Sequence, residues 1–428
     1  MKYVWKTMLI VLAVLCMIAV INIAIGRDNE VQDVMLADFS ATISTRPPTT
    51  LEYSFTEGGG ITNGGVAHDN GGMQGNGSTD PNNGGLDVGS EDDYIDYAHL
   101  LYYDPDGYYN IGYDSTPYDY ACPYTVTILL SAAGDVTLGG DSRWNGYHQF
   151  MRYFRNSGGD HSIFFANVAH IFYESDISVV NLEGTLTYAT EHMDKTFVFR
   201  GPPHFAQILT AGNIDIVSIA NNHTIDFFDR GMRDTRNALS YVGVEYFGNE
   251  FNTIMEVNGI KVGFFGFRIW ADTAGNRELI TNAIQDLRNR GAQLIVAFHH
   301  WGVERSTMPE QYQINIGRHT LRSGADLVLG SHPHVIQGIE EYNGRFIVYS
   351  LADFCFGGNA NSPDQHAMIF QQTFTFYRGV LQPDSDINIL PVFMSSVRTH
   401  NNFQPIVAEG ADAELIMERI ERYSEWLR

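Results

Sequence analysis

Cysteine and basic residues are both scarce in this chain of 428 residues. Its three cysteines, Cys16, Cys122 and Cys355, are too few for a disulfide framework, although Cys122 and Cys355 could pair with each other. Lysine and arginine number 26 against 50 aspartates and glutamates, so the net charge is -24. That balance argues against nucleic acid and against an anionic membrane surface as partners.

Long apolar segments are also lacking, with one exception near the amino end. Residues 8–25 form an apolar run that only Asn22 interrupts, and Lys2 and Lys6 precede it. The run is just long enough to cross a bilayer as a helix, and the lysines place the amino end in the cytoplasm. We therefore expect residues 1–26 to be a signal anchor and transmembrane helix. The protein would then be a single-pass protein of the cell membrane with an extracellular C-terminal domain. A cleaved signal peptide is the alternative, because residues 24–26 are a tolerable cleavage site.

Residues 27–123 differ in composition from the rest of the chain. They hold 17 acidic residues against 2 basic ones, with repeated glycine pairs among asparagines and aspartates. Such a stretch cannot bury enough apolar surface to offset its chain entropy, so we expect a disordered, self-repelling acidic linker. Its tyrosine-rich end could dock on the folded domain or on a cell-wall polymer.

Residues 124–428 alternate apolar, β-rich runs with amphipathic segments, which predicts an α/β domain. Strands are predicted at 125–133, 177–180, 195–200, 214–220, 293–298, 327–329, 345–351, 366–377 and 386–393. Helices are predicted at 161–175, 231–242, 278–290, 314–323 and 411–428, the last with Leu415, Ile416, Ile420 and Leu427 on its buried side. Asn258-Gly259 predicts a hairpin between 253–257 and 260–267.

Polar residues of metal-ligand type follow most of the predicted strands. They are Asp135, Glu183, Asn222 with His223, His300, and His332 with His334. Each alone is equally well a turn, cap or packing residue. Together, at the strand ends where α/β sheets bind ligands, they match the ligand set of a two-metal hydrolase. All but His223 are predicted to hold divalent cations (Mn, Zn or Fe), up to two in number.

The segment Gly330-Ser331-His332-Pro333-His334 ends one of these strands. On an extended backbone, residues two apart point to the same side, and Pro333 stiffens the segment. His332 and His334 are therefore predicted to aim two imidazoles at one point, unless they are ordinary hydrogen-bonded loop residues.

Two further pairs are candidates for catalysis and substrate binding. His223 is predicted to act as general acid or base, with Asp226 fixing its tautomer. Lys195 and Arg200 are predicted to hold an anionic substrate, Arg200 by bidentate contact. A surface salt bridge is an equally good interpretation of Arg200.

Six of these motifs, in this order, resemble the CapA (PgsA-like) family of poly-γ-glutamate capsule synthesis proteins over roughly residues 125–395. They are Gly134-Asp135, Asn181-Leu182-Glu183, Ala220-Asn221-Asn222-His223-Thr224-Ile225-Asp226, His300-Trp301-Gly302 with Glu304, Gly330-Ser331-His332-Pro333-His334-Val335, and Tyr349-Ser350-Leu351. The resemblance implies a four-layer αββα sandwich related to calcineurin-like metallophosphoesterases.

The sequence departs from this family pattern at two places. The first acid, Asp135, is not followed by the Asp-x-His of ordinary metallophosphoesterases, so one metal is expected to be lost or weakly bound. Leu351-Ala352-Asp353-Phe354 stands where the family has Leu-Gly-Asn-Phe, so Asp353 either changes the charge of the ligand set or caps a turn.

The resemblance implies membrane anchoring and a role in making, exporting or anchoring poly-γ-glutamate. The expected function is a metal-dependent hydrolase or transferase, with the polymer, the membrane and synthase subunits as partners. A non-catalytic, polymer-binding accessory subunit of the synthase complex is the alternative, and a structural wall-associated protein is a third.

Overall fold

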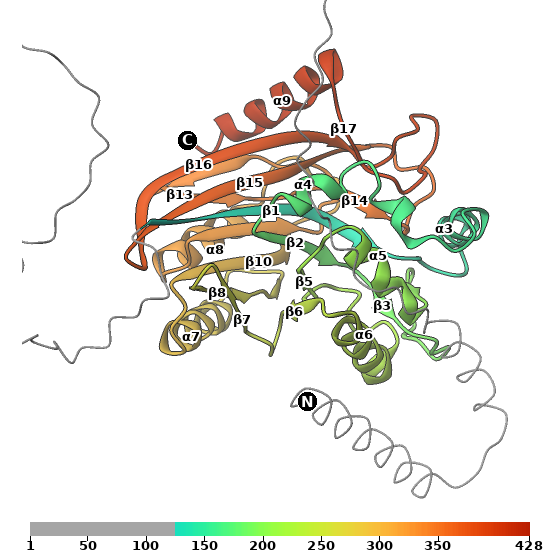
Figure 1. The fold of residues 1–428 in the computed structure, drawn as a ribbon, viewed down its shortest axis with the longest axis horizontal. Coiled ribbons are helices and arrows are strands. Elements are labelled where there is room, and N and C mark those ends of the chain that lie inside the picture. The colour runs from blue at the N-terminus through green and yellow to red at the C-terminus, as the bar shows by residue number, and fades with distance from the viewer. Residues whose placement is uncertain (1–124) are drawn as a thin grey trace, which may run out of the picture. The chain divides into compact units, whose positions relative to one another are not determined.

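Two β-sheets form the centre of the structure, a computed structural model that describes residues 125–428 (Figure 1). The first sheet has the order β17-β16-β15-β1-β2-β5-β6, with β14 beside β1. Its strands are β1 (Thr125–Thr137), β2 (Ile177–Leu182), β5 (Ile216–Ser218), β6 (Glu245–Phe247), β14 (Asp353–Phe356), β15 (His366–Tyr377), β16 (Val380–Phe393) and β17 (Ile406–Val407).

The second sheet has the order β12-β13-β11-β10-β8-β7, with β9 beside β10. Its strands are β7 (Thr253–Val257), β8 (Ile260–Phe265), β9 (Arg268–Ile269), β10 (Leu294–Trp301), β11 (Leu327–Ser331), β12 (Ile339–Tyr342) and β13 (Arg345–Val348). A two-stranded piece, β3 (Thr185–Leu186) with β4 (Arg200–Gly201), stands apart. The helices are α3 (Asn145–Asn156), α4 (Ala169–Tyr173), α5 (Ala206–Ala211), α6 (Phe228–Val242), α7 (Ala274–Asn289), α8 (Gln311–Arg322) and α9 (Gly410–Glu425).

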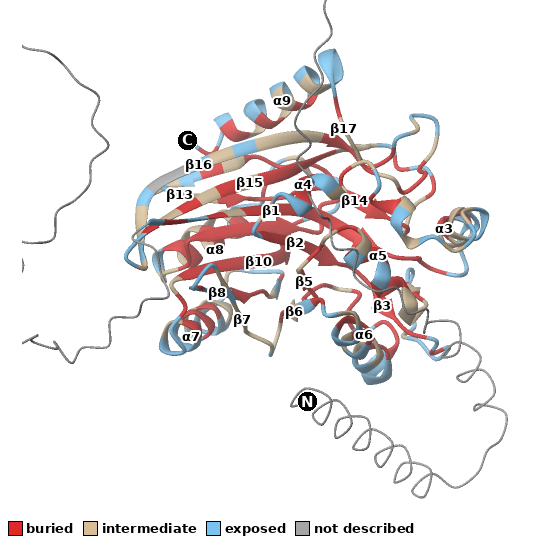
Figure 2. Cartoon of the chain, viewed as in Figure 1, coloured by how far each residue is buried: buried red, intermediate tan, exposed pale blue. Residues whose placement is uncertain are grey.

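Strand β10 shows how one segment serves two apolar cores. Successive side chains of a strand point to opposite faces. Val296 and Phe298 accordingly join the core that also contains Leu130 of the first sheet, whereas Ile295 and Ala297 join the core beneath α7 and α8. Burying such a side chain stabilises the fold by about 1.5–3 kcal/mol. The buried strands fill the middle of Figure 2, and the outer faces of α6, α7 and α9 are exposed.

Parallel pairing sets the carboxyl ends of the central strands side by side. In the first sheet β1, β2 and β5 are parallel, with Asp135 opposite Asn181 and Asn181 opposite Ser218. In the second sheet β8, β10, β11 and β13 are parallel, with His300 opposite Ser331. The predicted α/β class is therefore confirmed for residues 125–428, as is the hairpin at Asn258-Gly259, where both residues have positive φ.

Three predictions about individual helices and strands are wrong. Residues 161–175 form a 3-10 turn (His161–Phe164) and the short α4 instead of one helix. The N–H groups of Phe165 and Val168 bond to the carbonyls three residues back, Ser162 and Phe165, which is the 3-10 pattern and not the α-helical one. Only Arg200 of residues 195–200 lies in a strand, because two backbone N–H groups there donate to carboxylates, Val198 to Asp141 and Phe199 to Asp226.

The third error is in the last helix, where Leu415 is 53% exposed while Ile416, Ile420 and Leu427 are buried as predicted.

The predicted anchor and linker, together with Cys16 and Cys122, lie outside the described residues. Cys355 is fully buried as a free thiol. Within residues 125–428, each helix is too short or too polar to cross a membrane.

Candidate metal centre

The predicted ligands, which come from five different strand ends, lie together in one buried cluster. Asp135 lies near the end of β1, Glu183 follows β2, Asn222 and His223 follow β5, His300 lies in β10, and His332 and His334 follow β11. Each is less than 9% exposed except the half-buried Asn222. A backbone N–H of His332 donates to Asp135 Oδ2 at 3.2 Å, so the cluster joins the two sheets.

Glu183 is the central residue of this cluster. Its side chain is fully buried, and neither carboxylate oxygen has a hydrogen-bond partner. Oε1 lies 3.8 Å from Nε2 of both His223 and His300, and Oε2 lies 4.0 Å from Nδ1 of His334. Burial raises the pKa of Glu183 well above its usual value. A buried carboxylate without donors needs a compensating positive charge, which a divalent cation supplies.

Asp135, Glu183 and His334 form the first group with ligand atoms close enough to hold a cation. Asp135 Oδ1 accepts a hydrogen bond of 2.7 Å from Asn181, and its Oδ2 lies 3.3 Å from Nδ1 of His334. Burial alone would lower the pKa of His334, but Asp353 and Glu183 beside it raise the pKa well above the usual value. In this structure the His334 imidazolium therefore supplies the positive charge that the surrounding carboxylates favour.

Glu183, His300 and His332 form a second group that shares Glu183 with the first. His300 Nε2 lies 2.7 Å from Asn222 Oδ1, and His332 Nδ1 is buried without a partner. Burial lowers the pKa of His300 well below its usual value and that of His332 to about 4. Both are therefore neutral at pH 7, the form in which imidazole binds metals. Glu304, His332 and His334 make a third group, in which Glu304 is exposed.

The predicted extended presentation of His332 and His334 is wrong. Their φ values are +96° and +56°, so both residues turn through left-handed backbone instead of continuing the strand. Their rings still converge, with centroids 5.8 Å apart.

His223, Asp226 and Lys195 form a hydrogen-bonded chain at the edge of the cluster. Asp226 Oδ2 lies 2.6 Å from His223 Nδ1, and Lys195 Nζ donates to Asp226 Oδ1 at 2.8 Å. Because a carboxylate only accepts hydrogen bonds, His223 Nδ1 donates and its Nε2 faces Glu183. The ring of His223 also stacks on Phe199 at 4.0 Å. Burial lowers the pKa of His223, so Nε2 is a free base at neutral pH.

Both of the predicted substrate-binding cations have partners inside the protein. Lys195 donates to the Asn222 carbonyl as well as to Asp226. The Arg200 guanidinium donates to the Ala189 carbonyl oxygen and lies 5.3 Å above the ring of Phe227. The salt bridge considered for Arg200 is absent from the ion pairs of the described residues.

Sequence reasoning missed three residues that complete the site. Asn181 and Asn221 hydrogen-bond to each other at 3.2 Å, and Asn221 also receives the His223 backbone N–H at 3.0 Å. Both asparagines are next to or near predicted ligands in the sequence, and this proximity could have identified them as site residues. Trp270, 44% exposed, lies edge-on to His332 at 4.7 Å, and its position in the sequence gives no hint of this contact.

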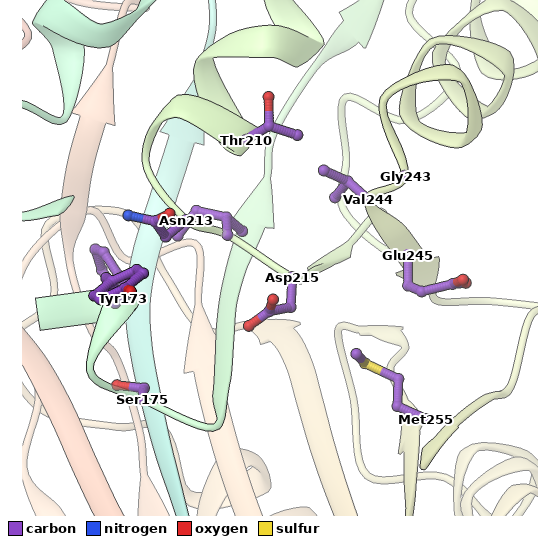
Figure 3. Close-up of a pocket in the computed structure, with 11 residues that line it drawn as sticks. Tyr173, Ser175, Thr210, Asn213, Asp215, Gly243, Val244, Glu245 and Met255 are labelled. Atoms are coloured by element: carbon purple, nitrogen blue, oxygen red, sulfur yellow. The ribbon is translucent and has the colours of Figure 1, made fainter. Parts of the chain in front are cut away.

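A cavity of about 340 Å³ lies elsewhere in the domain (Figure 3). Tyr173, Asp215 and Glu245 are among its lining residues, and it opens where β2, β5 and β6 begin. It shares no residue with the cluster, which lies where the strands end. The ligand-type residues therefore gather in the buried cluster and not around this cavity.

Residues 129–358 match the family model described as "Bacterial capsule synthesis protein PGA_cap". The chain is 29% identical over 255 residues to the "PGA biosynthesis protein CapA" of Bacillus subtilis (strain 168), which covers 53% of this chain and 63% of that one. It is 30% identical over 186 residues to the "Capsule biosynthesis protein CapA" of Bacillus anthracis, covering 38% and 45%.

A third relative is a "Probable polyglutamine synthesis accessory protein" of Mycobacterium tuberculosis (strain ATCC 25618 / H37Rv). It is 25% identical over 284 residues, covering 58% of this chain and 73% of that one. The match with each of the two Bacillus relatives spans less than two thirds of the relative's own length.

Proposed function

The chain belongs to the PGA_cap family of bacterial capsule synthesis proteins, and from this premise we propose that it takes part in the synthesis or export of poly-γ-glutamate. We propose the activity of a metal-dependent hydrolase or transferase that acts on the polymer, on a γ-glutamyl amide or on a phosphoester. The apolar run at residues 8–25 supports a membrane anchor with the C-terminal domain outside the cell.

One observation carries the metal-dependent activity. Glu183 is buried with both oxygens unpaired and belongs to two ligand groups, Asp135/Glu183/His334 and Glu183/His300/His332. A carboxylate shared by two groups suits a pair of cations that act on one reacting centre. Two stacked sheets with ligands at their strand ends also support the four-layer αββα fold of calcineurin-like metallophosphoesterases.

Divalent cations in this cluster would activate water and stabilise developing negative charge. His223 would move the proton: its Nε2 faces Glu183, and Asp226 holds the opposite nitrogen at 2.6 Å. A neutral His223 accepts a proton at Nε2 as general base and returns it to the leaving group as general acid. Lys195 fixes Asp226 in turn. Phe199, stacked on His223, excludes water from one face of the ring.

The test compares His223→Asn with His148→Asn, a control at an exposed histidine of α3. Full-length proteins loaded with Mn²⁺ or Zn²⁺ are incubated with poly-γ-glutamate, γ-glutamyl amides and aryl phosphates. Chain length and released product are then measured. We expect turnover by the wild type and by His148→Asn, and a loss of about 10²–10⁴-fold in His223→Asn with the metal content unchanged. If the metal-loaded wild type turns over none of these substrates, the enzymatic proposal is wrong.

A non-catalytic accessory subunit is the second candidate function. The name of the Mycobacterium tuberculosis relative includes "accessory protein", and both predicted substrate cations of this chain are engaged internally. An accessory role predicts that the wild type binds poly-γ-glutamate and synthase subunits without shortening or transferring the polymer. Copurification with the synthase and sedimentation with the polymer, each beside the turnover assay, distinguish the two functions.

A further inference from the structure

Asp353 lies beside Asp135 although 218 positions separate them in the sequence. Strand β14 pairs in parallel with β1, and Asp135 is the register partner of Asp353. Register partners on neighbouring strands project from the same face of a sheet. Asp353 is 2% exposed, so the pairing brings a second buried aspartate to the cluster.

The contacts of Asp353 differ from those of a turn cap. Its Oδ1 lies 2.7 Å from His334 Nδ1, and its Oδ2 is buried without any hydrogen-bond partner. A capping carboxylate would accept backbone N–H groups, and no such bond to Asp353 is present among the described residues. The unpaired oxygen points to a missing positive charge.

The choice of ring nitrogen distinguishes a ligand from a residue that only orients His334. An orienting carboxylate binds the imidazole nitrogen that faces away from the metal. Here the same atom, His334 Nδ1, lies 2.7 Å from Asp353, 3.3 Å from Asp135 and 4.0 Å from Glu183. The three carboxylates therefore lie around the same ring nitrogen.

We infer that Asp353 is a direct metal ligand, which completes an oxygen-rich position made of Asp135, Glu183, Asp353 and His334. The neighbouring position, with Glu183, His300 and His332, is richer in nitrogen. Carboxylate-rich sites suit harder cations such as Mn²⁺ and Mg²⁺, and imidazole suits Zn²⁺ and Fe. The two positions thus differ in metal preference. This inference rests on the proposed metal-dependent function and extends it to the identity of the cations.

The test uses Asp353→Asn and Asp353→Ala in the full-length protein, with the exposed Asp412→Asn as a control for the loss of one negative charge. Chelator-treated proteins are titrated with Mn²⁺ and Zn²⁺ by calorimetry, and free Mn²⁺ is followed by electron paramagnetic resonance. Asn can still accept the His334 N–H, so Asp353→Asn keeps an orienting role but removes the ligand charge. A ligand role predicts that both variants lose more Mn²⁺ affinity at one position than the roughly 10–100-fold that losing an orienting partner costs, with Zn²⁺ bound as before at the other.

Three outcomes overturn the inference, and they are distinguishable from one another. If Asp353→Asn binds Mn²⁺ like the wild type and only Asp353→Ala loses Mn²⁺ affinity, then Asp353 orients His334 and is not a ligand. A wild type that binds no divalent cation overturns the metal chemistry of the proposed function as well. X-ray absorption of the Mn-loaded wild type checks the assignment without any variant, because a nitrogen-rich ligand shell contradicts it.

Discussion

Replacing Glu183 with glutamine is expected to change the stability of the protein in opposite directions with and without metal. In the metal-free protein, Glu183 is a fully buried carboxylate with no hydrogen-bond donor. Gln has nearly the same shape but no charge, so it removes the main cost of burial. In the metal-loaded protein the same change removes a ligand that both candidate positions share.

The magnitude follows from the burial of this group. A buried, unpaired polar group costs about 1–3 kcal/mol, and a charged group costs more by a similar amount. The glutamine amide still bears the first cost, but it removes the excess that belongs to the charge. We therefore expect Glu183→Gln to raise the free energy of unfolding of the metal-free protein by about 1–3 kcal/mol, roughly 2–10 °C in Tm. With each cation at about a hundred times its Kd, the wild type gains about 2.7 kcal/mol for each of the two cations bound, most of which the variant forgoes. The order of the two Tm values should then reverse.

The dependence of stability on pH tests independently whether Glu183 destabilises the metal-free protein. Burial raises the pKa of Glu183 well above 4.5, so the native metal-free protein keeps a proton that the unfolded chain has released. The contribution of Glu183 to stability is therefore most favourable below the unfolded pKa and becomes less favourable as pH rises towards the folded pKa. Glu183→Gln should remove this slope.

Thermal unfolding of full-length protein, in chelator and in excess Mn²⁺, tests the reasoning. The matched control is Glu340→Gln, because Glu340 is equally buried but accepts hydrogen bonds from Arg318 and Tyr349 at 2.6 Å each. This control should be destabilised under both conditions. If Glu183→Gln is destabilised in chelator as much as Glu340→Gln, then Glu183 has a structural role and the reasoning fails.

Two further predictions concern the scaffold. Arg419→Gln should lower the free energy of unfolding at pH 7 by about 1.5–3 kcal/mol, because Arg419 holds the pKa of Asp364 below 3.8 although burial alone would raise it. The stabilisation from this pair is present above the unfolded pKa of Asp364 and is lost as pH falls. The free energies of unfolding of variant and wild type, measured by chemical denaturation, should therefore converge in acid. Gly134→Ala should lower the free energy of unfolding by about 1–3 kcal/mol and lower the metal content measured by elemental analysis. A Cβ at this position would collide with the Ala352 carbonyl, which accepts the Asp135 N–H at 2.9 Å. Normal stability together with a normal metal content would contradict this prediction.

The sequence was sufficient to predict that the ligand-type residues meet. Asp135, Glu183, Asn222, His300 and His332 each follow an apolar, β-rich run, and the carboxyl ends of parallel strands share one edge of a sheet. The prediction needed only the type of each residue and its place after a strand. Neither depends on the conformation of a loop, so both could be read without a structure.

Conformations that depend on distant partners could not be read in this way. The segment that ends in Arg200 has the composition of a strand, yet two of its N–H groups bind Asp141 and Asp226, which are far away in sequence. The positive φ of His332 and His334 is equally hidden, because left-handed backbone is unusual for such residues. The pairing of Asp353 with Asp135 depends on β14, a four-residue strand that follows Ala352 at a φ of +67°.

The net charge of -24 bears directly on the choice between the proposed functions. Poly-γ-glutamate is itself anionic, and like charges repel. The cluster adds three buried carboxylates, Asp135, Glu183 and Asp353, while Lys195 is bound to Asp226. Without cations we therefore expect the centre to repel the polymer, whereas two divalent cations would reverse the sign of its local field. Both proposed roles of this centre, binding the polymer and reacting with it, would consequently require divalent cations. If the protein is the proposed accessory subunit and binds the polymer through this face, we expect it to need metal as well.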